Sequence, residues 1–340
     1  MPTLYLKGHE TEARVENDNV EVSAIDREKD DVRTVNIPFF DISRVVVVGR
    51  ASLTTPLIHR LTHHGIPITF LASSGRWLGT LEPNANGHAL RRLRQYELAH
   101  DKSFALDIGR RAVTCKIRNS RRGLQRLAAN RGAPSEPEQL RTCDTLQEYA
   151  RKAGEAADLG SLRGFEGVAG AAYFQRLRVF FPETVPFQGR NRRPPKDAAN
   201  ALLSWTYTIT LSEIDGALRA AGLDPCLGFL HEVSYGRPSL SLDLLEPLRP
   251  ALCDLLVLRI LNHKLLKPEH FEFHSDDGGT YLSRDARRGF FMEYERSMTR
   301  RFAPAKGAPH TDFRGVIRSQ TESLLRALER RGDAEFFRMP

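Results

Sequence analysis

The sequence is poor in cysteine and has no long apolar run. Its four cysteines are far apart and include no C-x-x-C pair, which argues against a disulfide framework and a zinc ribbon. No apolar stretch is long enough to cross a bilayer, and the N-terminus lacks the basic and apolar regions of a signal peptide. We therefore expect a cytoplasmic protein with no membrane segment, in which the cysteines are reduced and buried. They are Cys115, Cys143, Cys226 and Cys253.

Acidic residues are fewer than basic ones. The chain has 50 lysines and arginines against 42 aspartates and glutamates, a formal charge of +8 and a pI near 9.5. A basic surface attracts polyanions whatever the fold, so nucleic acid is the leading partner. A basic protein without such a partner is the alternative, which net charge does not exclude. No P-loop is present, so no use of nucleotide hydrolysis is implied.

The 340 residues suffice for two domains. Residues 1–84 contain short β-rich segments separated by Gly, Asn and Asp turns, and the polar segment Pro83–Gly87 reads as a linker. From 88 to 340 the pattern is mostly helical. The fold class is therefore α+β, with a small β-rich N-terminal domain followed by a larger, mostly α-helical domain. The predicted strands are 4–6, 20–22, 35–37, 45–48, 66–71 and 77–81.

One helix interrupts these strands. It is predicted to have Thr55 as N-cap, Pro56 in its first position and Gly65 just past its end. His59 and His63 lie four residues apart on it, as metal ligands often do. Because the glutamate of an H-E-x-x-H motif is missing and no third ligand is near, we expect surface histidines.

Residues 89–130 form a long helical tract, predicted to break near Gly109 and Gly123. Its arginines recur at three- and four-residue spacing and share a face, which is either a solvated helix face or a stripe that binds phosphate. Thr145 and Glu148 have the spacing of a capping box that opens the next helix. The arginines on the shared face are Arg118, Arg121, Arg122 and Arg126.

The segment 161–174 has large apolar residues at helical spacing on one face and glycines and alanines on another. Glu166 stands at the edge of this bare face. Two interpretations are open: the helix packs closely on a neighbour and Glu166 pairs with Arg163, or the bare face admits a ligand.

The segment 181–196 is predicted to be an irregular loop, before a helix that Asp197 caps and that runs to about Ala221. Basic residues mixed with an aromatic suit contact with a DNA backbone, or a loop that orders only when DNA binds. Further on we predict a hairpin at 271–283, whose Asp276 and Asp277 serve the turn, and an amphipathic helix at 316–331. The loop carries Phe187, Arg190, Arg192, Arg193 and Lys196.

The stretch 228–250 holds His231, Asp243 and Glu246. A turn at 235–238 bends the chain back toward His231, and leucines around the acids place them against a core. If 242–264 is a helix, its prolines 247 and 250 leave the carbonyls of Asp243 and Glu246 unpaired and distort the first turn. The simpler alternative is two acids stabilised at a helix start.

Glu166, His231 and Glu246 together supply two carboxylates and an imidazole from three elements of one domain. This set suits Mg²⁺ or Mn²⁺, with the imidazole favouring Mn²⁺, whereas Zn²⁺ more typically uses additional histidine or cysteine ligands. On a protein that binds polyanions, such a metal would catalyse hydrolysis or transesterification of a phosphodiester.

Three blocks of this chain resemble the signature blocks of the CRISPR-associated endonuclease and integrase family, the universal enzyme of spacer acquisition. The similarity spans nearly the whole chain, and the order, spacing and flanking residues of the blocks agree. The blocks are Glu166-Gly167 with the following Ala/Gly run and Tyr173-Phe174, then Gly228-Phe-Leu-His231, then 242–250, which reads LDLLEPLRP.

The resemblance implies a metal-dependent DNA endonuclease and integrase that inserts spacers into a CRISPR array. The family's ligands fall on Glu166, His231 and Glu246, and Asp243 matches an assisting acid. It implies homodimers formed through the β-rich domain, and a complex with a small ferredoxin-like CRISPR protein. That complex joins spacer-precursor DNA to the CRISPR repeat. A non-catalytic DNA-binding scaffold and a structure-selective nuclease without integration are the alternatives. Candidate DNA contacts are Arg118, Arg122, Arg190, Arg192, Arg193 and Lys196.

Overall fold

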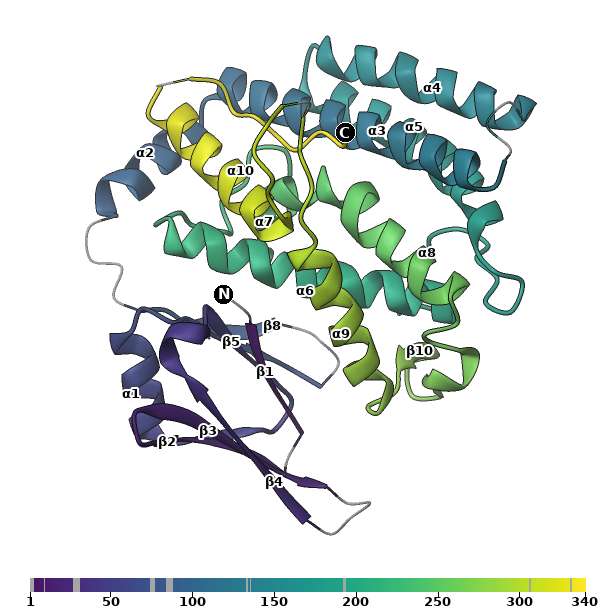
Figure 1. Cartoon of the computed structure of the whole chain (residues 1–340). Helices are drawn as coiled ribbons and strands as arrows, with labels where there is room; N and C mark the ends of the chain where they lie inside the picture. The colour runs from purple at the N-terminus through teal and green to yellow at the C-terminus, as the bar shows by residue number, and fades with distance from the viewer. Residues whose placement is uncertain are drawn as a thin grey trace. The chain divides into compact units, whose positions relative to one another are not determined.

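The computed structural model describes residues 3–340 except 9, 27–30, 74–76, 84–87, 133, 135, 192–193, 306 and 331. The chain divides into two compact units, Met1–Ala89 and Leu90–Pro340. The first is rich in strands and the second is mostly helical, so the predicted α+β class is confirmed (Figure 1). Most of the predicted linker, residues 84–87, lies outside the described residues.

The N-terminal unit contains two four-stranded sheets. The first has the order β1-β5-β7-β8, in which β8 alone is antiparallel to its neighbour. The second has the order β4-β3-β2-β6, and β2 and β6 were not predicted. The first sheet consists of β1 (Thr3–Lys7), β5 (Arg44–Val48), β7 (Ile68–Leu71) and β8 (Trp77–Leu81), and the second of β2 (Thr11–Glu16), β3 (Asn19–Asp26), β4 (Asp31–Pro38) and β6 (Ser52–Leu53).

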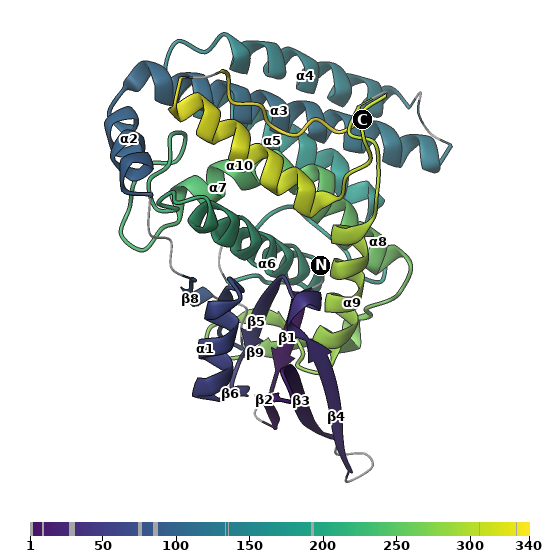
Figure 2. The ribbon, with the colours of Figure 1, turned by 60° about the vertical axis from the view of Figure 1, so that its left-hand side comes forward.

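Both sheets and helix α1 (Thr55–His63) share one apolar core, to which Leu6, Val20 and Leu57 each contribute (Figure 2). The run Val45–Val48 is buried throughout, as is typical of a central parallel strand covered on both faces. Helix α1 begins one residue earlier than predicted, because Thr54 takes the N-cap position. His59 and His63 are exposed on it.

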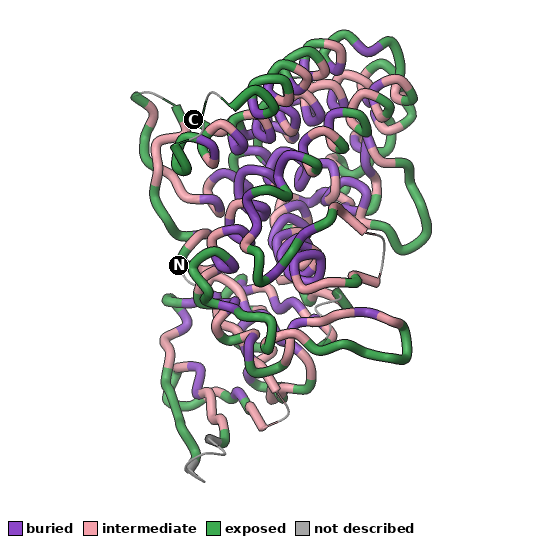
Figure 3. The backbone as a smooth tube through the Cα atoms, turned by 90° about the vertical axis from the view of Figure 1, so that its right-hand side faces the viewer, coloured by how far each residue is buried: buried purple, intermediate pink, exposed green. Residues whose placement is uncertain are grey.

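The C-terminal unit is built from helices and one hairpin (Figure 1), and its buried residues gather in its interior (Figure 3). Helix α6 is the most deeply enclosed of the long helices that the structure describes, because most of its residues are buried. The elements are α2 (Ala89–Ala99), α3 (Lys102–Asn130), α4 (Pro137–Gly154), α5 (Leu159–Leu177), η2 (Arg178–Phe180), α6 (Ala198–Ala220), α7 (Ser239–Leu245), the π-helix η3 (Arg249–Asp254), α8 (Leu255–Asn262), η4 (Pro268–His270), β9 (Phe271–His274), β10 (Gly279–Leu282), α9 (Ala286–Thr299) and α10 (Phe313–Leu328).

The long tract 89–130 breaks at Asp101 and not at its glycines. Asp101 caps α3 by accepting from the backbone N–H groups of Ser103 and Phe104. Gly109 instead lets α5 approach, since a Cβ there would lie 3.0 Å from Leu162 Cδ2. The predicted capping box is also wrong: Thr145 lies inside α4, which begins at Pro137, and its hydroxyl donates to the Arg141 carbonyl.

The predicted helix 242–264 is three segments, α7, η3 and α8. Proline removes a backbone N–H and disfavours helical geometry in the turn before it. The regular helix therefore ends at Leu245, and the chain continues as the π-helix from Arg249. The carbonyl of Pro247 in this break accepts a 2.8 Å bond from the Asn119 side chain. The Asn119 side chain thus ties α3 to the backbone of this break.

Several other predictions hold. Helix α5, the Asp197 cap of α6, the hairpin β9–β10 and helix α10 are present near the predicted bounds. Cys115, Cys143 and Cys253 are buried free thiols, but Cys226 is exposed. Phe187 belongs to the core and stacks on Phe181, so it is not the surface aromatic we expected. Within the described residues, no helix combines the length and apolarity needed to span a bilayer.

Candidate active site

Glu166 lies on α5, beside α3 in Figures 1 and 2, and its carboxylate pairs with α3 and not with its own helix. Its Oε1 is 2.5 Å from Lys116 Nζ. The predicted partner Arg163 instead binds Glu232 and the Leu230 carbonyl. A Cβ placed on Gly167 would meet nothing within 4 Å. The bare face of α5 is therefore open around Gly167, whereas Ala169 is buried.

His231 is oriented by Asp243. Its Nδ1 lies 2.6 Å from Asp243 Oδ1, and that fully buried carboxylate also accepts from the backbone N–H groups of Phe229, Leu230 and His231. A carboxylate oxygen in contact with Nδ1 accepts a hydrogen bond from it, so the contact favours the imidazole tautomer with its proton on Nδ1. The other ring nitrogen, Nε2, is thereby left to act as an acceptor or metal ligand on the side facing Glu246, whose Oε1 is 3.9 Å away.

Gly228 makes this arrangement possible. A Cβ at this position would lie 2.7 Å from the backbone carbon of Ser239 and 2.8 Å from Asp243 Oδ2. Only glycine allows the irregular segment 228–231 to approach α7 closely enough for Asp243 to reach its backbone donors. Gly236 has φ +68°, which fits the predicted turn that returns the chain from His231 to α7.

Glu246 lies in the break after α7 and is 3% exposed at its side chain. Its Oε1 is 3.0 Å from Arg249 and its Oε2 is 2.6 Å from Lys116 Nζ. Burial by itself raises the pKa of this carboxyl, but Arg249, Lys116 and His231 together lower the pKa to about 2. Burial likewise lowers the pKa of Lys116, and the two carboxylates reverse that effect and raise it.

The π-helix positions Arg249 beside the carboxylate of Glu246. Its guanidinium lies 4.7 Å from the Tyr207 ring centroid. Asp254, at the end of the π-helix, accepts from the hydroxyls of Tyr207 (2.6 Å) and Tyr173 (2.8 Å). Burial raises the pKa of Asp254 above its ordinary value. Since Tyr173 belongs to α5 and Tyr207 to α6, this cluster connects the π-helix to both of these helices.

Glu166, His231 and Glu246 come from three separate elements: Lys116 Nζ contacts both Glu166 and Glu246, and His231 Nε2 lies 3.9 Å from Glu246 Oε1. Within the described residues, no three His, Cys, Asp or Glu side chains are already arranged to hold a metal ion. The ammonium of Lys116 lies between the two carboxylates instead. The donor set nevertheless fits a divalent cation: two carboxylates and an imidazole whose other nitrogen is held by a carboxylate. Glu246 Oε2 has the ammonium nearby but no partner of hydrogen-bond geometry.

The predicted DNA-binding residues lie in different environments. Arg118 and Lys196 are exposed. Arg122 is exposed and donates to Pro340 O. Arg190 is held inward by Asn200 and lies over the Tyr207 ring. Arg192 and Arg193 lie outside the described residues.

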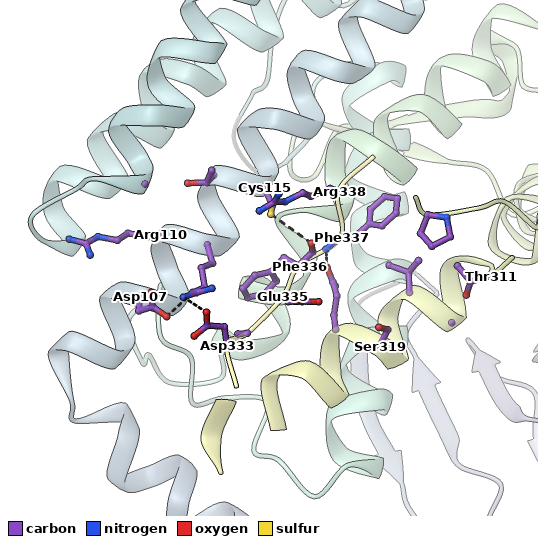
Figure 4. Close-up of a pocket in the computed structure, with 18 residues that line it drawn as sticks. Asp107, Arg110, Cys115, Thr311, Ser319, Asp333, Glu335, Phe336, Phe337 and Arg338 are labelled. Atoms are coloured by element: carbon purple, nitrogen blue, oxygen red, sulfur yellow. Dashed lines mark hydrogen bonds and ion pairs between the residues drawn. The ribbon is translucent and has the colours of Figure 1, made fainter. Parts of the chain in front are cut away.

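A cavity of about 780 Å³ lies elsewhere, between α3, α10 and the C-terminal segment 333–338 (Figure 4). Cys115 faces this segment and is 3.7 Å from the Phe336 carbonyl. None of Glu166, His231 and Glu246 lines the cavity. It is therefore separate from the cluster of acids and histidine.

Two charged residues of the site escaped the sequence analysis, Lys116 and Arg249. Lys116 lies in the same helical tract as the arginines Arg118, Arg121, Arg122 and Arg126, but it is not one of the residues on their shared face. The buried positions Ala112, Asn119 and Gly123 on α3 share its helical phase, so the spacing itself indicates that Lys116 points inward and needs a partner. Arg249 lies between Pro247 and Pro250. These prolines distort the helix, so the side of the helix on which Arg249 lies does not follow from the spacing of the sequence.

The family model described as CRISPR associated protein Cas1 matches residues 4–296. The chain belongs to the Cas1 family. It is 34% identical over 291 residues to "CRISPR-associated endonuclease Cas1 3" of Thermus thermophilus, covering 86% of this chain and 84% of that protein. It is 36% identical over 332 residues to a Cas4/Cas1 fusion of Rhodospirillum rubrum, described as a CRISPR-associated exonuclease and endonuclease. That match covers 96% of this chain and only 56% of the fusion.

Solved structures share the Cas1 fold. A casposase bound to an integration product matches with a TM-score of 0.85 and 21% identity, over 100% of this chain and 94% of that one. A chain of a Cas6-RT-Cas1–Cas2 complex matches with a TM-score of 0.77 and 28% identity, over 100% of this chain and 36% of that one. Both likenesses extend over the β-rich and the helical unit of this Cas1 chain.

Proposed function

We propose that this chain is a divalent-metal-dependent DNA endonuclease and integrase that inserts spacers into a CRISPR array by transesterification. The observation that carries the proposal is that Glu166 and Glu246, which are far apart in sequence, meet at Lys116 Nζ, and that His231 Nε2 lies 3.9 Å from the other oxygen of Glu246. Membership of the Cas1 family and the endonuclease names of its relatives support the reaction class. The net charge of +8 supports a polyanionic substrate.

In this proposal Glu166, Glu246 and His231 Nε2 hold Mg²⁺ or Mn²⁺. The metal, when bound, supplies a Lewis acid that polarises the phosphodiester and stabilises the oxyanion leaving group. Asp243 keeps the His231 ring oriented and its Nδ1 protonated. Arg249 holds one oxygen of Glu246 and so fixes the direction of its carboxylate.

The test is a strand-transfer assay with Mn²⁺ on DNA that carries a CRISPR repeat. Glu166→Gln, His231→Ala and Glu246→Gln should each abolish joining of 3′-hydroxyl ends while DNA affinity is largely kept. Glu148→Gln, on the surface of α4 and paired with Lys152, is the matched control and should stay active. Full activity in all three site variants would refute the proposal.

A second candidate is a non-catalytic DNA-binding scaffold, in which the same residues form a structural ion-paired cluster. The Lys116 bridge favours it, because such a cluster needs a cation between its carboxylates. It predicts no heat of Mn²⁺ binding in calorimetry and loss of folding in the site variants. A third candidate, a nuclease without integration, is distinguished from the integrase by comparing cut with joined DNA products in the strand-transfer assay.

For the assembly, we propose a homodimer formed through the β-rich unit and a complex with the small ferredoxin-like CRISPR partner, in the cytoplasm. The similar chain in a Cas1–Cas2 complex supports a Cas partner. Light scattering of the chain alone tests the dimer. Strand transfer with and without the partner tests whether the complex is required, and equal activity in both would show that it is not.

A further inference from the structure

Lys116 binds both candidate metal-holding carboxylates at once. Its Nζ is 2.5 Å from Glu166 Oε1 and 2.6 Å from Glu246 Oε2. Mg²⁺ binds carboxylate oxygens at roughly 2.0–2.1 Å. The ammonium therefore occupies the space between the two oxygens that a metal held by both of them would need. Two cations cannot share this place, since both would need the same oxygens and would repel each other.

Glu246 is also held by a second cation, Arg249. A metal that binds Glu246 must displace one of these two cations. Arg249 packs over the Tyr207 ring, and its guanidinium contacts the other oxygen, Oε1. Lys116 contacts Oε2 of Glu246 and Oε1 of Glu166. The Lys116 side chain is 20% exposed and ends a flexible four-carbon stem. Lys116 is thus the cation that can leave, while Arg249 stays.

The two carboxylates would repel each other without a cation between them. Glu166 is 19% and Glu246 3% exposed at the side chain, so solvent screens this repulsion only weakly. A site that relied on metal alone would be strained whenever metal is absent. Lys116 supplies the missing positive charge from within the fold, on a rigid helix of 29 residues.

We propose that Lys116 is an internal counter-cation that competes with the divalent metal for Glu166 and Glu246. It keeps the carboxylates together in the metal-free protein, and metal binds only by displacing its ammonium. The site is thereby assembled before metal arrives, at the expense of metal affinity. This inference rests on the proposed metal-binding function and adds to it a residue that sets the affinity.

The experiment measures Mn²⁺ binding by calorimetry and thermal unfolding, in EDTA and with Mn²⁺. Lys116→Met removes the charge and keeps most of the stem. We expect its Tm in EDTA to fall below that of the unchanged chain, its Mn²⁺ affinity to rise about tenfold or more, and Mn²⁺ to raise its Tm further than it raises that of the unchanged chain. Lys116→Arg keeps the charge and should not gain affinity. Lys152→Met, which removes a surface ion pair on α4, should change neither the Tm nor the Mn²⁺ affinity.

Equal or weaker Mn²⁺ binding by Lys116→Met would overturn the competition while leaving the metal site itself intact. Absence of Mn²⁺ binding in every protein, including the unchanged chain, would overturn the proposed metal dependence and the competition with it. Should Lys116→Met fail to fold in EDTA, Lys116→Gln purified in the presence of Mn²⁺ gives the same comparison after a chelator titration. Weaker retention of Mn²⁺ by that variant than by the unchanged chain would count against the proposal.

Discussion

His231 Nδ1 and Asp243 Oδ1 lie 2.6 Å apart, and the same carboxylate accepts three backbone N–H groups from 229–231. Asp243 therefore determines both the path of the chain at His231 and the orientation of the ring. It does so from α7, one turn before Glu246. Helix α7 thus carries the group that aligns one candidate ligand, and its C-cap residue is another candidate ligand.

Asp243→Asn should weaken Mn²⁺ binding and strand transfer by about 10–100-fold, because loss of a carboxylate that orients a histidine ligand has effects of that size. It should also lower stability, since an amide NH₂ would face backbone N–H donors. Calorimetry, strand-transfer rates and thermal unfolding measure the three effects. Asp144→Asn, exposed on α4, is the control and should change none of them. Unchanged Mn²⁺ affinity in Asp243→Asn would show that Asp243 does not support the site.

Glu246→Gln should lose stability in a pH-dependent way when metal is absent. The pKa of Glu246 is lowered from 4.5 to about 2, so its contribution is present above pH 4.5 and is lost as the pH falls through 2. Near neutral pH the unchanged chain should exceed the variant by on the order of 3 kcal/mol in free energy of unfolding. Denaturant titrations in EDTA between pH 7 and pH 2 measure the difference, which should shrink on acidification. A constant difference would contradict the lowered pKa.

Gly228→Ala should destabilise the helical unit by roughly 1–3 kcal/mol, because the added Cβ would meet the Ser239 backbone and the Asp243 carboxylate. The displaced Asp243 should also release His231, so strand transfer should fall. Gly216→Ala in α6 is the matched control: its Cβ would meet nothing within 4 Å, and alanine is favoured in helices. Thermal unfolding of both variants measures the difference in stability. Equal stability of the two would mean that the close approach at Gly228 is not required.

Arg118→Gln combined with Arg122→Gln should weaken DNA binding uniformly across sequences and reduce its salt dependence. Both side chains are exposed on α3, where they are able to neutralise phosphates. Each lost phosphate contact should lower the slope of log K against log salt by roughly one. Fluorescence anisotropy at several salt concentrations measures that slope. Arg163→Gln, whose guanidinium is held by Glu232 and Leu230, is the comparison and should leave the slope unchanged.

Local signals in the sequence were sufficient for much of the fold. Valine-rich runs bounded by turns located the main strands, and the caps of α6 and the hairpin β9–β10 could be read because they depend on neighbours two to four residues away. The break at Asp101 was missed because two glycines nearby looked like stronger interruptions. In the structure Gly109 serves packing against Leu162, a contact about fifty residues distant that no local rule contains.

By itself, the sequence determined which acids and which histidine form the candidate site, since they lie in distinctive blocks and carry the donor atoms that Mg²⁺ or Mn²⁺ prefers. Only the tertiary structure decided the pairing of charges within it. The sequence offered Arg163 as the partner of Glu166, but the phase of α3 gave that carboxylate to Lys116, and Arg163 pairs with Glu232. Ion pairs between separate helices depend on how those helices pack, and that is set by the whole core and not by the spacing of the charged residues.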